Sequence, residues 1–191
     1  MSADPTNPSS LSSFQQFSLV AMRTLIGWHF LYEGIYKMRL PGWAPDGTPL
    51  PAWSASGFIH GATGPLGSLA RAAVGAGLLP WIDRLMMLGV AAVGLSLILG
   101  LLTRAGCVGG LLLLGLFYLS AVPTTGMPAE HAEGSYLLVN KTLVEAAAVL
   151  VLLAFDTGRI AGLDRLWRDR RQNNLASPLT AADARAVQQG S

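Results

Sequence analysis

Apolar residues along the chain gather in four blocks rather than in the amphipathic stripes typical of helices on a soluble protein. The blocks cover about residues 17–38, 85–102, 105–122 and 137–155. At 1.5 Å per residue, an 18-residue helix is about 27 Å long, close to the roughly 30 Å hydrocarbon core of a bilayer. The pattern therefore predicts an all-α membrane protein, a four-transmembrane-helix bundle in which Thr103 and Arg104 alone join the second and third spans in a tight antiparallel hairpin.

The composition favours the same class of protein. Only 13% of the residues are charged, against roughly 25% in soluble proteins, and the mean hydropathy is +0.44. A net charge of +2 gives no reason to expect a nucleic-acid partner. The single cysteine, Cys107, excludes an internal disulfide framework, a cysteine-ligated iron–sulfur cluster and covalently attached c-type haem.

Arginine residues indicate which side of the membrane each segment faces. They gather in the turn between the second and third spans and after the fourth, at Arg104, Arg159, Arg165, Arg168, Arg170, Arg171 and Arg185. Because cytoplasmic segments are rich in Arg and Lys, we expect the N-terminal segment 1–16 and the Arg-rich tail 156–191 to be cytoplasmic. The flank before the first span has no Lys or Arg, and the span itself is charged, so we expect it to be retained rather than cleaved as a signal peptide.

The segment 39–84, between the first and second spans, is then extracytoplasmic. Residues 54–81 within it are apolar but interrupted by Gly64-Pro65 and Pro80, too broken for a fifth span. We expect short helices that form a lid over the mouth of the bundle. Its tryptophans, Trp43, Trp53 and Trp81, suit either an aromatic belt at the membrane interface or contact with a ligand.

Charged side chains inside membrane spans are costly and point to a function. Four polar residues of the first span share one helical face at 100° per residue: Arg23, His29, Glu33 and Lys37. Lys141 and Glu145 lie four residues apart on the fourth span, one above the other. Glu33 and Glu145 lie about 8 and 12 Å below the outer ends of their spans. We therefore expect Glu33 and Lys37 to face Lys141 and Glu145 inside the outer half of the bundle.

Two interpretations of this charged cluster remain open. In one, the pairs neutralise each other and hold the first and fourth spans together without chemistry. In the other, they form a polar pocket that binds and protonates a ligand. Arg23 lies near the inner end, where its long side chain is expected to reach the cytoplasmic headgroups.

The second and third spans carry small residues suited to close helix packing, namely Gly89, Ala92, Ser96, Gly100, Gly106, Gly110 and Gly115. The larger side chains Met86, Met87, Phe117 and Tyr118 suit the core or lipid contact, or else a slot for a flat apolar ligand.

No metal or haem is predicted. His29 is the only histidine within a span, so two facing helices cannot supply bis-histidine haem ligation. His29 and Glu33 are four residues apart, not three as in the di-iron Glu-x-x-His motif. We expect His29 to be a hydrogen-bonded interior residue, with ligand binding or proton transfer as the alternative.

Five segments resemble the DoxX/DoxD family of membrane proteins. They are RTLIGWHFLYEGIYK (23–37), SGFIHGATGP (56–65), GLLTR (100–104), EGSYLLVNK (133–141) and residues 158–167 with GLDR. Together they extend over most of the chain, from about residue 17 to 168. The resemblance implies a four-helix protein of a bacterial or archaeal cytoplasmic membrane, similar to the membrane subunit of thiosulfate:quinone oxidoreductase, which acts with a partner subunit.

A quinone fits the chemistry of the charged cluster better than thiosulfate does. It needs an apolar slot, a donor to its carbonyl oxygen and a carboxylate that moves protons. The candidate catalytic residues are Glu33 and Glu145, and the candidate quinone-binding residues are His29, Lys37, Asn140 and Lys141. The chain has no flavin motif, metal site or second thiol that could take electrons from sulfur, so any such oxidation needs a partner subunit or a mechanism that these residues do not reveal. The alternatives are a non-catalytic membrane subunit that anchors or stabilises a larger complex and, less favoured, a small-solute transporter.

Overall fold

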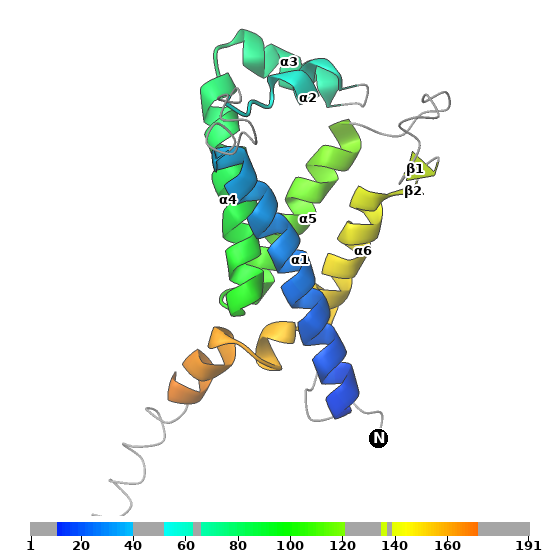
Figure 1. Ribbon diagram of the computed structural model, residues 1–191, viewed down its shortest axis with the longest axis vertical. Coiled ribbons are helices and arrows are strands. Elements are labelled where there is room, and N and C mark those ends of the chain that lie inside the picture. The colour runs from blue at the N-terminus through cyan, green and yellow to red at the C-terminus, as the bar shows by residue number, and fades with distance from the viewer. Residues whose placement is uncertain (1–10, 40–51, 63–65, 121–134, 137–138, 172–191) are drawn as a thin grey trace, which may run out of the picture.

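The computed structural model describes residues 11–39, 52–62, 66–120, 135–136 and 139–171, and this part of the chain is almost wholly helical (Figure 1). In chain order the elements are α1 (Ser13–Arg39), α2 (Ser56–His60), α3 (Gly67–Gly75), α4 (Leu79–Leu99), α5 (Thr103–Ser120), β1 (Ser135–Tyr136), β2 (Val139–Asn140), α6 (Lys141–Ala154) and the 3₁₀ helix η4 (Thr157–Arg159). A further helix covers residues 163–171. The two strands pair antiparallel, with Tyr136 opposite Val139. Trp43, Gly64-Pro65, most of the 1–16 segment and the tail beyond residue 171 lie outside the described residues.

Helices α1, α4, α5 and α6 pack around one core. In Figure 1 α1 crosses diagonally along α4, α5 lies behind it, and α6 stands beside α5; contacts between α1 and α6 complete the group. The buried core consists of Phe30, Val90, Val93, Leu97, Cys107, Leu114, Val149 and Leu152. Cys107 is thus an interior residue.

Glycines allow α1 and α4 to pack backbone against backbone. A Cβ on Gly34 of α1 would lie 2.6 Å from the backbone nitrogen of Ala91, and one on Gly94 of α4 would lie 2.6 Å from the carbonyl oxygen of Gly27. Small residues permit this approach, as the sequence suggested for other positions. Of the small residues singled out in the sequence, Gly106 of α5 packs directly against Ser96 of α4, and a Cβ on Gly100 would lie 2.8 Å from the Cα of Gly162. Gly89 and Gly115 do not take part in close packing, because a Cβ on either would meet no neighbouring atom within 4 Å.

The boundaries of the second and third predicted spans were partly wrong. Helix α4 begins at Leu79, six residues before the predicted start, because Pro80 occupies its first turn, where a missing N–H costs nothing. It ends at Leu99 and is capped by Gly100, whose φ of 61° lies in the left-handed region favoured by glycine. Thr103 and Arg104 are the first residues of α5 rather than the connection, which is made by residues 100–102.

The fourth predicted span, 137–155, begins too early. Helix α6 has 14 residues and starts at Lys141, because the side chain of Asn140 accepts a hydrogen bond from the backbone N–H of Leu143 and so caps the helix. Val139 and Asn140 are extended. At 1.5 Å per residue, the helix itself is about 21 Å long.

Helices α2 and α3 lie across one end of the four long helices, at the top of Figure 1, which we name the lid end. The sequence predicts short helices in this segment. They are joined to the rest by an edge-on contact between the rings of Phe58 and Phe117, with centroids 5.9 Å apart, and by a 2.7 Å hydrogen bond from the backbone N–H of Ala55 to Asp83. The opposite end, which carries η4 and residues 163–171, is named the tail end.

Two of the described helices, α4 and α5, are long and apolar enough to cross a membrane. Helix α1 is longer than either but is interrupted by its polar residues, and α6 has only 14 residues. Among the described helices, α4 and α5 alone meet this criterion of length and composition.

Candidate functional site

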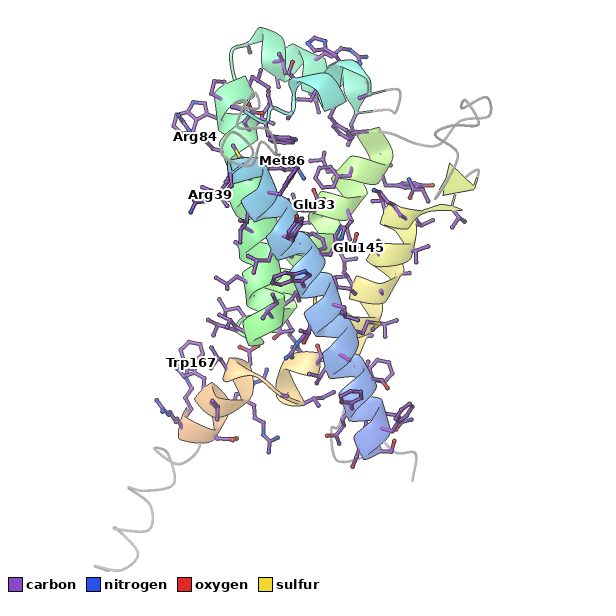
Figure 2. All side chains as sticks on the ribbon, in the orientation of Figure 1. Glu33, Arg39, Arg84, Met86, Glu145 and Trp167 are labelled. Atoms are coloured by element: carbon purple, nitrogen blue, oxygen red, sulfur yellow. The ribbon has the colours of Figure 1, made fainter. Side chains whose placement is uncertain are left out.

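A cavity lies between α1 and α6 in the half of the molecule nearer the lid. Its volume is about 170 Å³, and its polar wall consists of His29, Glu33 and Lys37 from α1 and Lys141, Thr142 and Glu145 from α6. Phe30, Val90, Leu114 and Phe117 form its apolar wall. Figure 2 shows Glu33 on α1 and Glu145 on α6 at similar heights along the two helices.

Helical spacing explains why these side chains share the cavity. Glu33 and Lys37 are four residues apart and form an ion pair within α1. Between the two helices, Nε2 of His29 lies 3.7 Å from a carboxylate oxygen of Glu145. The cavity is thus bounded by one charged pair on α1 and one contact that joins α1 to α6.

The two carboxylates differ in their shielding. The Glu145 side chain is 20% exposed, whereas that of Glu33 is 43% exposed. The only two lysines of the chain, Lys37 and Lys141, both line the cavity, so its charges are balanced. Lys37 also lies over the ring of Trp53, 5.5 Å from its centroid, in a cation–π contact. A ligand here would meet charged donors, carboxylates and aromatic surface together.

Five of the six candidate site residues line this cavity: His29, Glu33, Lys37, Lys141 and Glu145. Asn140 does not, because its side-chain oxygen is used to cap α6. An asparagine directly before an apolar run is typical of a helix N-cap, so the sequence already contained this signal. Asn140 lines instead an apolar groove that adjoins the cavity through Lys141 and Glu145.

As expected, Glu33 and Lys37 of α1 share one cavity with Lys141 and Glu145 of α6. The contact between His29 and Glu145 across the two helices was not predicted. The His29 side chain is 56% exposed, so its prediction as a hydrogen-bonded interior residue was wrong. Thr142 was not singled out as a site residue, because a single threonine has no periodic signal that points to the cavity. Trp53, for which the sequence left contact with a ligand open, lies against Lys37.

Arg23, which shares the polar face of α1, belongs to the tail end. Its side chain is only 2% exposed, and Nη1 donates hydrogen bonds to the carbonyl oxygens of Thr157, at 2.9 Å, and Ala161, at 2.7 Å. The prediction that it extends to the headgroups was wrong, because the chain after α6 folds back over it and supplies carbonyl acceptors. Arg23 therefore joins α1 to the segment around η4.

Asp164 joins the helix at residues 163–171 to the start of α5. Its carboxylate accepts hydrogen bonds from the backbone N–H groups of Leu102, at 2.7 Å, and Thr103, at 2.8 Å. Burial opposes ionisation, but these N–H groups, with further help from the Thr103 hydroxyl and Arg168, hold the pKa of Asp164 below its ordinary value. The ionised carboxylate thus accepts hydrogen bonds from backbone N–H groups at the start of α5, which have no acceptor within the helix.

Asp156 forms the centre of an arginine cluster beside this junction. Its side chain is buried, and one carboxylate oxygen lies 3.0 Å from Arg104, 2.7 Å from Arg159 and 3.9 Å from Arg168. The sequence analysis used these arginines as signs of membrane orientation and did not predict that they share a buried carboxylate. The acidic partner was missed because it lies far from Arg104 in the chain.

Comparison with protein-family models, curated proteins and solved structures finds no match. Among the described residues, no group of three or more His, Cys, Asp or Glu side chains is placed to hold a metal ion.

Proposed function

We propose that this chain is an integral membrane protein in which α1, α4, α5 and α6 all cross the bilayer. The observation that carries the proposal is the distribution of side chains: a polar cavity is enclosed by helices whose outward faces expose large apolar residues. These include Leu25 and Trp28 on α1, Leu85, Leu88 and Leu95 on α4, Leu112 and Leu116 on α5, and Val144 and Leu150 on α6. Apolar surface this extensive is unfavourable in water and suits contact with lipid.

The shortness of α6 is compatible with a crossing. A helix of about 21 Å is shorter than the hydrocarbon core, and a bilayer adapts to such a mismatch by thinning or through flanking residues that extend to the interface. Arg104, Arg159 and Arg168 gather at the tail end, so the positive-inside rule favours a cytoplasmic location for that end and for both termini.

We further propose that the cavity binds the ring of a quinone. Its volume of about 170 Å³ lies below the roughly 300–1,000 Å³ of cavities for drug-sized ligands, and so suits a single ring. Lys141 offers a charged donor for a carbonyl oxygen, and the aromatic side chains of Phe30 and Phe117 contribute to the apolar wall. The adjoining groove, lined by Ile26, Val144 and Ala148, shares Lys141 and Glu145 with the cavity and suits an isoprenoid tail.

The chemistry assigned to these residues is proton delivery. Reduction of a quinone takes up two electrons and two protons, and Glu145, in contact with His29, would supply protons to the bound ring. The electrons would come from a partner subunit. The resemblance of residues 23–37 and 133–141 to the DoxX/DoxD family supports this role, because both segments contribute to the cavity.

Quinone binding by the purified full-length chain tests the proposal. The detergent-solubilised protein should bind a short-chain ubiquinone analogue, measured by equilibrium dialysis. Lys141→Met should weaken binding by about 10- to 100-fold, because a hydrogen bond to a charged group contributes about 1.5–3 kcal/mol. Glu33→Gln should also weaken binding, because it removes the carboxylate that pairs with Lys37 in the cavity wall. Arg170→Met and Asp169→Asn remove equivalent charges from exposed positions at the other end and should leave the affinity unchanged.

Thermal unfolding of each variant establishes that its fold is retained. Equal quinone affinity in the wild-type protein, Lys141→Met and Glu33→Gln would show that the cavity does not bind quinone. Loss of affinity in the two control variants as well would show that binding depends on overall charge.

A further inference from the structure

The tail end contains a second cavity, larger than the first. Its volume is about 350 Å³, and it lies between the start of α5 and the helix at residues 163–171, lined by Leu102, Arg104, Asp164, Trp167, Arg168 and Arg171 among others. Figure 2 places Trp167 beside this junction, at the opposite end of the molecule from Arg84. Neither the quinone proposal nor the exposed apolar faces account for this cavity.

The walls of this cavity carry a positive net charge. Three guanidinium groups, those of Arg104, Arg168 and Arg171, face one carboxylate, that of Asp164. That carboxylate is already occupied by the backbone N–H groups of α5. The cavity therefore presents cationic donors in excess.

Two of the arginines share their acidic partner and remain accessible. The Arg104 and Arg168 side chains are 65% and 43% exposed, and both approach the same oxygen of Asp156, which Arg159 also contacts. One carboxylate cannot satisfy three guanidinium groups, each of which carries five donors. Arg168, at 3.9 Å, has the longest of these contacts and retains donors for a further anion.

An apolar groove adjoins the cationic cavity. It is lined by Leu101, Leu163, Leu166, Trp167 and Arg170, and Trp167 belongs to both. At 100° per residue, Leu163, Leu166 and Trp167 fall on one face of the helix, whereas Arg168 and Arg171 fall on the side toward the cavity. The guanidinium of Arg171 lies 4.9 Å from the centroid of the Trp167 ring. The charged surface and the apolar surface of this helix are thus adjacent, with Trp167 between them.

We infer that this paired surface binds an anionic phospholipid, with the phosphate between Arg104, Arg168 and Arg171 and the acyl chains along Leu163 and Leu166. A guanidinium group can donate two parallel hydrogen bonds to the oxygens of one phosphate. Tryptophan beside arginine is typical of the headgroup region of a membrane. The helix at residues 163–171 would lie in the interface, with its leucines toward the acyl region. The apolar groove favours a lipid over free phosphate, which would leave these leucines in water.

Lipid titrations of the detergent-solubilised full-length protein, followed by native mass spectrometry, test this inference. The wild-type protein should bind phosphatidylglycerol more tightly than phosphatidylcholine. Arg168→Gln and Arg171→Gln should each reduce the affinity for phosphatidylglycerol by about fivefold, the contribution expected of one arginine near an anionic lipid surface. The affinity for phosphatidylcholine should not change.

Arg84→Gln is the matched control. Arg84 stacks on Trp81 at 5.4 Å, in the same kind of pair, but at the start of α4 on the lid end. Its replacement should leave the affinity for phosphatidylglycerol unchanged. Asp156 keeps Arg104 and Arg159 as partners in Arg168→Gln, so the fold should be retained, and thermal unfolding checks this directly.

Three results would overturn the inference. These are equal affinity of the wild-type protein for the two lipids, an unchanged affinity for phosphatidylglycerol in Arg168→Gln and Arg171→Gln, and displacement of phosphatidylglycerol by inorganic phosphate, which would identify a site for the free anion. The inference rests on the proposed membrane location but not on quinone binding. Quinone is measured at the other end of the molecule, so the two proposals can fail separately.

Discussion

A single added methyl group tests the close packing of α1 on α4. A Cβ on Gly94 would lie 2.6 Å from the carbonyl oxygen of Gly27 and 2.7 Å from the Cα of Leu31, whereas ordinary contacts begin near 3.4 Å. The opposing atoms belong to the backbone, so α1 must shift as a whole. We expect the overlap in Gly94→Ala to cost about 1–3 kcal/mol, the range observed when a packed interior is overfilled.

Gly89→Ala on the same helix provides the reference. Both substitutions gain about 1 kcal/mol of helix propensity, but a Cβ on Gly89 meets nothing within 4 Å. The difference in stability between the two variants therefore isolates the steric term. At about 2–4 °C per kcal/mol for a chain of this size, Gly94→Ala should unfold about 2–12 °C below Gly89→Ala.

Thermal unfolding in detergent, followed by far-ultraviolet circular dichroism, measures this difference. The shift of α1 should also move His29 away from Glu145, so Gly94→Ala should weaken quinone binding while Gly89→Ala does not. Equal unfolding temperatures for the two variants would refute the reasoning, because they would mean that the helices are not in backbone contact at Gly94.

Two further predictions concern the tail end and the membrane. Because the pKa of Asp164 is lower in the folded protein than in the unfolded chain, its stabilising contribution is present above about pH 4 and is lost as the pH falls through the folded-state pKa. Asp164→Asn should therefore lower the unfolding temperature at neutral pH, and the difference from the wild-type protein should become smaller in acid. A difference that does not change with pH would exclude stabilisation by the ionised carboxylate. Cys107→Ser removes the native cysteine, so that a spin label can be attached at position 112, where Leu112 is 71% exposed. In liposomes this label should be accessible to oxygen and shielded from a water-soluble nickel complex. A label at Arg165 should behave oppositely, and equal nickel accessibility at the two positions would contradict the four-span proposal.

Much of the candidate site could be predicted because residues four apart share a helical face in any tertiary context. That rule places Glu33 beside Lys37 and Glu145 beside Lys141. The apolar blocks predicted four long helices, and each was found within a few residues of its expected position. The errors arose at helix ends, where Asn140 and Pro80 act through local backbone geometry that hydrophobicity does not report.

The sequence by itself determined the helices, their polar faces and the positions of the charged residues along them, because these depend only on local periodicity and apolar length. The tertiary structure alone decided that His29 meets Glu145, that Arg23 is buried beneath Thr157, and that Asp164 satisfies the start of α5. Each of these contacts joins residues far apart in the chain. Their formation depends on how the helices rotate and cross and on where the chain reverses, and no repeating pattern along the chain records those angles.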